Sequence, residues 1–265
     1  MSHAPATQEP APLVIQDLTV VYQKRPVLYG VDVTIPRGQM VGILGPNGAG
    51  KSTLIKTAMG FLRPTGGAVR IFGKPPRDAV KRVGYVPQRE SVDWDFPVTV
   101  MDVVLMGRYG RLGLFRRPKR EDREVAQACL ERVGMLAFAD RQIGNLSGGQ
   151  QQRVFLARAL AQESDLYFMD EPLAGVDAAT ERALIALLRE LKANGKTILV
   201  VHHDLATARE YFDHILLLNM RLVAYGPTEE VFTAALLQKA YGGRLTVLSE
   251  IASVAARSGV DATPR

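Results

Sequence analysis

The sequence has one cysteine and lacks any long apolar run. Because Cys129 is the single cysteine among 265 residues, no internal disulfide can form, and nothing indicates an oxidising compartment. No apolar stretch approaches the ~20 residues needed to cross a bilayer, and 197–201 and 215–218 have the length of buried strands. The first residues lack the basic and apolar regions of a secretory signal. We therefore expect a cytoplasmic protein, able to work at a membrane only by binding something embedded there.

The charge balance excludes little. The chain has 33 basic and 27 acidic side chains and a net charge of +6, which suits nucleic acid, a membrane surface or a nucleotide equally well. Basic residues crowd one stretch, where a solvated face and a docking surface near anionic lipid head groups are both open interpretations: Arg108, Arg111, Arg116, Arg117, Lys119, Arg120 and Arg123.

The pattern of apolar residues changes twice along the chain. Short β-branched or apolar segments predict strands at 13–22, 31–35, 40–44 and 68–72, with a helix at 51–61. Residues 92–163 favour helices, including one at 122–133 in which Cys129 is a core residue. Alternation then returns, with strands at 165–169 and 197–201 and a helix at 178–192. The order predicts a doubly wound, mostly parallel α/β core with a helical insertion.

A glycine-rich segment between a predicted buried strand and a helix fits the pattern G-x-x-x-x-G-K-[ST]: Gly45, Pro46, Asn47, Gly48, Ala49, Gly50, Lys51 and Ser52. Glycines let successive N–H groups turn toward one anion, and a helix N-terminus adds partial positive charge. Lys51 is expected to neutralise β- and γ-phosphate oxygens, and Ser52 to bind Mg²⁺. A plain glycine turn would not explain the flanking strand and helix. The segment, called the phosphate loop below, therefore predicts that the chain binds the phosphates of a nucleotide, a property that kinases, GTPases and motor ATPases share.

Two carboxylates end the apolar segment 166–169. Asp170 is suited to hold Mg²⁺ through water, and Glu171 to accept a proton from an attacking water. Such a pair is common at ordinary strand ends, but its place about 120 residues after a phosphate loop makes a hydrolytic site the better interpretation.

The segment Leu146 to Gln150 reads LSGGQ. Ser147 and Gln150 satisfy a capping box and predict a helix start. Capping does not explain Gly148 and Gly149, each about 1 kcal/mol worse than alanine within a helix. We interpret the two glycines as room for a bulky ligand, most naturally a phosphate at the helix N-terminus.

With these motifs, residues 13–240 resemble the ATP-binding cassette (ABC) family, whose signature is LSGGQ. The resemblance implies a P-loop NTPase core with an antiparallel β-subdomain at the N-terminus and a helical subdomain inserted at 92–163. Residues 1–12 would be a disordered lead-in and 241–265 a C-terminal tail.

The resemblance also assigns site residues. Tyr22 would stack on adenine, Gln88 would sense Mg²⁺ and γ-phosphate, and His203 would be the switch histidine beside the general base. Thr53 extends the nucleotide-binding set of the phosphate loop. Asp177 is expected to cap a helix after a dimer-contact loop. A metal site at His202 and His203 is rejected, because neighbours on a strand point to opposite faces.

The resemblance implies that the working form is a head-to-tail homodimer. Each ATP would lie between the phosphate loop of one subunit and a set of residues of the other: Ser147, Gly148, Gly149 and Gln150. The segments 93–100 and 104–109, the pair His202-His203 and the segment 173–177 are similar to the cassettes of bacterial importers of manganese, zinc or iron. This implies membrane permease subunits, indirectly an extracytoplasmic metal-binding lipoprotein, no nucleic acid, and a peripheral place on the cytoplasmic face of the inner membrane. Cassettes of siderophore, haem or cobalamin importers, and a soluble cassette ATPase without a permease, are the alternatives.

Overall fold

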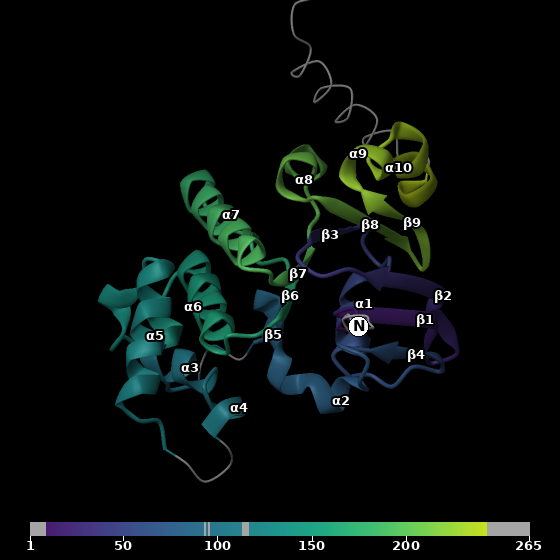
Figure 1. Ribbon diagram of the computed structural model, residues 1–265. Helices are drawn as coiled ribbons and strands as arrows, with labels where there is room; N and C mark the ends of the chain where they lie inside the picture. The colour runs from purple at the N-terminus through teal and green to yellow at the C-terminus, as the bar shows by residue number, and fades with distance from the viewer. Residues whose placement is uncertain (1–8, 93, 95, 113–116, 243–265) are drawn as a thin grey trace, which may run out of the picture.

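The computed structural model describes residues 9–242 except 93, 95 and 113–116. Most of the predicted lead-in and almost all of the predicted tail lie outside these residues. Two sheets organise the described chain, with a group of helices to one side of them (Figure 1).

The smaller sheet is antiparallel and built from the N-terminal part of the chain. Its strands are β1 (Leu13–Tyr22), β2 (Arg25–Ile35) and β4 (Gly66–Arg70), in the order β2-β1-β4. This confirms the antiparallel β-subdomain. Strand β2 is longer than the predicted 31–35 and begins at Arg25, because its first residues pair with the end of β1, where Tyr22 is opposite Arg25.

The larger sheet has the order β5-β6-β7-β3-β8-β9 and is parallel except for its last strand. Its strands are β3 (Met40–Leu44), β5 (Val83–Val86), β6 (Leu166–Asp170), β7 (Thr197–Val201), β8 (His214–Asn219) and β9 (Arg221–Pro227). Strands β3, β6 and β7 are buried along their whole length, as expected when both faces of a parallel sheet are covered. The mostly parallel α/β core is thus confirmed.

Sequence patterns did not predict two strands of this sheet. Strand β5 has only four residues, which is too short for a periodic signal. Strand β9 lies at the edge, and its partly exposed residues give no alternation.

The helices beside the larger sheet are α1 (Lys51–Ala58), α2 (Pro76–Ala79), α7 (Ala178–Ala193), α8 (Leu205–Tyr211), α9 (Thr228–Val231) and α10 (Ala234–Tyr241). Helix α1 is shorter than predicted, because Gly60 follows it with a left-handed φ of 78°. Short 3₁₀ turns occur at Val80–Arg82, Arg89–Ser91, Leu136–Phe138 and Ile143–Asn145.

The remaining helices form a group on the far side of β5 and β6 (Figure 1): α3 (Val100–Met106), α4 (Tyr109–Leu112), α5 (Arg120–Arg132) and α6 (Gly148–Ala161). Cys129 is buried among them, and burial raises its pKa to about 11, so the thiol stays protonated. This confirms its assignment to the core. Trp94 packs edge-on against Phe155 inside the group, whereas Phe96 is exposed.

The basic stretch is not one uniform solvated face. Arg108 is buried and pairs with Asp122 at 3.1 Å and with Glu163 at 2.7 Å. This side chain holds α5 and the end of α6 together, so it takes no part in a docking surface. Within the described part of the chain, no helix combines the length and apolarity that a membrane span requires.

Candidate functional site

The predicted site residues follow neighbouring strands of the larger sheet. The phosphate loop follows β3. Asp170 is the last residue of β6 and Glu171 comes directly after it, and the two histidines follow β7. Backbone hydrogen bonds join these ends: Glu171 N donates to Val201 O at 3.2 Å, and His202 N donates to Ile43 O at 3.1 Å. Because parallel strands end at the same edge, the topology brings these residues together.

The phosphate loop needs glycine at both ends. Gly45 has φ 156°, and a Cβ there would lie 2.0 Å from the carbonyl oxygen of Leu218. Gly50 has φ 94°, and a Cβ there would lie 2.6 Å from Leu28 Cδ2. Both positions combine a left-handed backbone with close packing, so any side chain would distort the loop.

The N-terminus of α1 is open to an anion. Gly50 caps the helix without any side-chain hydrogen bond to its first amides. These N–H groups therefore keep their donors for a ligand, and the helix dipole favours a negative one. The loop itself is held by the Ala49 amide, which donates to Pro46 O at 3.1 Å, and by Met220 N, which donates to Ala49 O at 2.9 Å.

Lys51 is folded back onto the loop. Its Nζ donates to Gly45 O at 2.7 Å and to Pro46 O at 3.1 Å. Burial lowers the pKa of Lys51, and the negative charges of Glu171 and Asp170 act in the opposite direction. An ammonium held here attracts a phosphate strongly, because little water screens it.

A pocket of about 900 Å³ opens above the loop. It is lined by Gly45, Pro46, Asn47, Gly48, Ala49, Gly50, Lys51, Ser52, Thr53, Gln88, Glu171 and His203, with Val27 and Tyr241 in addition. Segments far apart in the sequence therefore meet around one cavity. Tyr22 does not line it but lies half exposed at the end of β1.

Sequence reasoning missed Val27 and Tyr241. Val27 lies in β2 and Tyr241 ends α10, and neither belongs to a motif. A sequence signal could not identify them, because their role depends only on where the tertiary fold places them.

Asp170 lies beneath the pocket, where Ser52 Oγ donates to its Oδ1 at 3.2 Å. Burial raises the pKa of Asp170, with a smaller rise from the charge of Glu171, and the Ser52 hydroxyl lowers it. Hydroxyl and carboxylate oxygens are the ligands that Mg²⁺ prefers, directly or through water. A cation would also offset the buried negative charge, so these residues fit a magnesium ion.

Glu171 has an unusual backbone conformation. Its φ of 53° is left-handed, which is uncommon for a glutamate. The conformation ends β6 sharply, and the Glu171 carbonyl accepts a hydrogen bond from Ala174 N at 3.2 Å. A strained residue of this kind is a reason to suspect function, and here its side chain lines the pocket.

The two histidines lie in different surroundings. His202 is buried against Tyr211 and Phe212, and a 2.8 Å hydrogen bond joins its Nε2 to Thr207 Oγ1. His203 is exposed and lines the pocket. Among the described residues no cluster of His, Cys, Asp and Glu suits a metal ion.

His202 should make the fold sensitive to acid. Burial lowers its pKa from 6.5 to about 4, so between these values the unfolded chain binds a proton that the folded chain does not. The free energy of unfolding should therefore fall as pH drops through this window, by at most about 3 kcal/mol. Urea unfolding at several pH values measures this loss. His202→Gln should flatten the slope and His203→Gln should keep it; an unchanged slope in His202→Gln would rule out the assignment.

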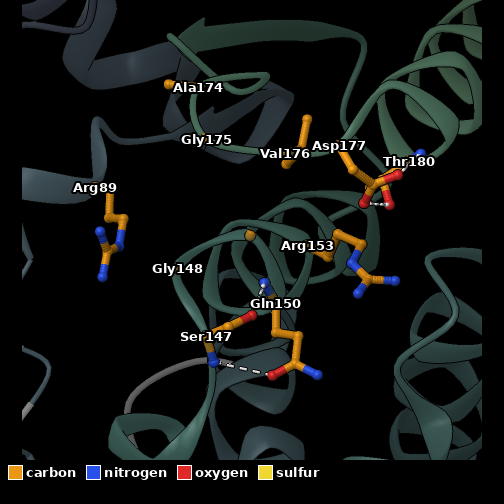
Figure 2. A pocket seen from close by; sticks show the side chains of 11 residues that line it. Arg89, Ser147, Gly148, Gln150, Arg153, Ala174, Gly175, Val176, Asp177 and Thr180 are labelled. Atoms are coloured by element: carbon orange, nitrogen blue, oxygen red, sulfur yellow. Dashed lines mark hydrogen bonds between the residues drawn. The ribbon is translucent and has the colours of Figure 1, made fainter.

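The LSGGQ segment forms a second pocket, of about 420 Å³ (Figure 2). Ser147 and Gln150 make the predicted capping box, in which Gln150 Oε1 accepts from Ser147 N at 2.9 Å. The predicted helix start is thus confirmed. The pocket is lined by Arg89, Ser147, Gly148, Gly149, Gln150, Arg153, Ala174, Gly175, Val176, Asp177 and Thr180.

The two glycines have neighbours within the chain. A Cβ on Gly148 would lie 2.7 Å from Arg89 Cζ, and one on Gly149 would lie 3.4 Å from Gly175 O. The sequence analysis explained the two glycines only by the approach of a ligand, and it did not predict that Arg89 and Gly175 lie beside them. Arg89 is further held by its Nε, which donates to Gln151 Oε1 at 3.1 Å.

The loop 174–177 crosses the start of α6 (Figure 2). It ends at Asp177, whose carboxylate accepts from the amides of Ala179 and Thr180, both at 3.0 Å. The predicted N-cap of α7 is confirmed. A short, capped loop of this kind holds a fixed shape against the helix that carries LSGGQ.

Comparison with known proteins agrees with these motifs. Residues 28–174, more than half of the chain, match the family described as ABC transporter. The manganese transport system ATP-binding protein of Bacillus subtilis is 62% identical over 239 residues, which cover 90% of this chain and 96% of that one. The zinc transport system ATP-binding protein of Treponema pallidum is 60% identical over 232 residues, covering 88% and 87% of the two chains.

Solved structures agree as well. The chain is similar to an ATP-binding subunit of an ABC transporter, with a TM-score of 0.74, 28% identity, and coverage of 92% of this chain and 99% of that one. A dimeric ATP-binding cassette in a post-hydrolysis state, bound to ADP and phosphate, matches with a TM-score of 0.72, 29% identity, and coverage of 81% and 98%. The chain belongs to the ABC transporter family, of which it is an ATP-binding and ATP-hydrolysing cassette.

Proposed function

We propose that this cassette drives a bacterial importer of a divalent metal, with manganese, zinc or iron as cargo. One observation supports this choice of cargo: the chain is 60% or more identical, over nearly its whole length, to relatives named for manganese and zinc transport. The described residues hold no helix that could span a membrane. Because the relatives are named as ATP-binding proteins of transport systems, a separate membrane permease would carry the metal, and an extracytoplasmic metal-binding lipoprotein would deliver it.

The pocket residues suggest a division of roles. Lys51 and the loop amides would bind the phosphates, Glu171 would take the proton of the attacking water, and His203, which lines the same pocket, would hold the γ-phosphate. Gln88 reaches the same cavity and would sense the phosphate. Tyr22, exposed at the edge of the β-subdomain, would stack on adenine.

The magnesium ion of Mg-ATP would be held by Ser52, Asp170 and Gln88, and would neutralise the charge on the phosphates. The hydrogen bond between Ser52 Oγ and Asp170 Oδ1 supports this set, because it places the two oxygens 3.2 Å apart. Asp170 would act through water, as its burial beneath the pocket suggests.

A head-to-tail homodimer would complete the site. The phosphate loop and the LSGGQ segment line separate pockets of one chain, so Ser147, Gly148, Gly149 and Gln150 would bind the ATP of the partner subunit. A related cassette is dimeric with ADP and phosphate bound. Residues 13–240 would form the cassette, with 92–163 as its helical subdomain. The complex would place the chain on the cytoplasmic face of the inner membrane.

Uptake by a deletion strain tests the cargo. Cells without this chain should lose uptake of one divalent metal, measured with radioactive manganese, zinc and iron, and the wild-type gene should restore it. Affinity purification from detergent should recover a polytopic membrane protein. Loss of siderophore, haem or cobalamin uptake instead would reject metal-ion import, and soluble partners alone would reject transport.

A further inference from the structure

Tyr241 is a residue of the nucleotide pocket that no motif explains. It is the last residue of α10, and Gly242 ends the helix with φ 66°. Its side chain lines the pocket together with the phosphate loop. The far C-terminal helix therefore reaches the nucleotide site.

The hydroxyl of Tyr241 is buried and makes no hydrogen bond of good geometry among the described residues, although the Gly45 N–H lies near its oxygen. Burial raises the pKa of Tyr241 to about 12, and the nearby Gly45 amide acts against this rise. The phenol is therefore neutral at any physiological pH and keeps its proton. A buried hydroxyl without a partner is costly, which calls for an explanation.

A short chain of hydrogen bonds links α10 to the loop. Asn219 Nδ2 donates to Ala240 O at 2.8 Å, which fixes the end of α10 on the turn between β8 and β9. The next residue, Met220, donates its N–H to Ala49 O at 2.9 Å. Gly45 packs closely against the carbonyl oxygen of Leu218, the residue before Asn219 in β8. Tyr241 and the loop are thus held by one common turn.

Nucleotide binding would change the surroundings of this hydroxyl. Lys51 Nζ now occupies the carbonyl oxygens of Gly45 and Pro46, and it must turn toward phosphate oxygens to bind ATP. The backbone of Gly45 then loses a charged donor. Tyr241 is the neutral donor beside Gly45.

We propose that Tyr241 is a positioning residue for the phosphate loop, whose hydroxyl gains its partner at the Gly45 backbone when ATP draws Lys51 away. ATP affinity then depends on the docking of α10 against the loop. The inference rests on the proposed phosphate-loop site, and it assigns to the C-terminal helix a role in nucleotide binding.

Tyr241→Phe tests the hydroxyl alone. Without nucleotide, the variant should be as stable as wild type or melt about 1–3 °C higher, because an unpartnered hydroxyl is removed. Its dissociation constant for a fluorescent ATP analogue and its KM for ATP should rise about three- to tenfold, with kcat unchanged at saturation. A role in packing alone would leave both constants as they are.

Matched variants separate the outcomes. Tyr225 Oη donates to Gln39 Oε1 at 2.7 Å and does not line the pocket, so Tyr225→Phe should lower the melting temperature and leave ATP binding unchanged. Asn219→Ala should weaken ATP binding in the same direction as Tyr241→Phe. If Tyr241→Phe binds ATP like wild type while Lys51→Ala does not, Tyr241 has no such role; if Lys51→Ala also binds normally, the site itself is wrong.

Discussion

Replacement of Glu171 by glutamine is expected to leave a protein that binds ATP but hydrolyses it about 10²- to 10⁴-fold more slowly. Glutamine has nearly the shape of glutamate but cannot accept the proton of the attacking water. Binding should persist or improve, because Glu171 carries negative charge toward the pocket that receives the phosphates. Phosphate release measures the rate, and size-exclusion chromatography with ATP should show a dimer that accumulates.

Two controls accompany this variant. Glu121→Gln makes the same chemical change on the exposed face of α5 and should hydrolyse ATP normally. Glu171→Asp keeps a base but shortens the side chain, so it should recover part of the rate. Normal turnover by Glu171→Gln would show that another group is the general base.

Loss of the Lys51 side chain should weaken the binding of ATP itself, and not only slow its hydrolysis. Lys51→Ala is expected to weaken ATP binding about 10- to 100-fold, the loss of a hydrogen bond between charged groups. The nucleotide-free protein should remain folded, because burial of this ammonium disfavours its charged form. Isothermal titration with ATP and thermal melting without it separate the two effects.

Lys81→Ala is the matched control, since Lys81 is exposed and does not line the pocket. It removes one positive charge from the protein and should bind ATP with wild-type affinity. Equal binding by Lys51→Ala and wild type would contradict the assignment of the phosphate loop.

Local sequence patterns were sufficient for the parts of the fold whose chemistry is local. Strand β7 has the predicted bounds, and the caps at Ser147 and Asp177 form as expected. Each depends on a few neighbouring residues: an apolar run bounded by polar residues, or a side-chain oxygen placed before free amides. The residues gathered around the phosphate loop followed from motif order, because parallel strands end at one edge.

Contacts between distant segments could not be predicted. Arg108 belonged to a basic stretch in the sequence, yet it is buried against Glu163, which is 55 positions away. Arg89 gave no signal, but its guanidinium lies over Gly148. Strand β9 is defined by pairing with β8 rather than by its own pattern. In each case a partner supplied by tertiary structure decides the role.

Gln88 and Arg89 are adjacent, yet they line different pockets. Gln88 lines the phosphate pocket, and Arg89 lies against the start of α6 in the other. In the proposed head-to-tail pair these pockets would hold two different nucleotides, so a single peptide bond in each subunit would separate the contacts to both. A movement of the backbone at Gln88 would also act on Arg89, whose guanidinium is held at the start of α6 by Gln151. The pair would then respond as a unit, and its hydrolysis would depend on ATP concentration more steeply than that of two independent sites.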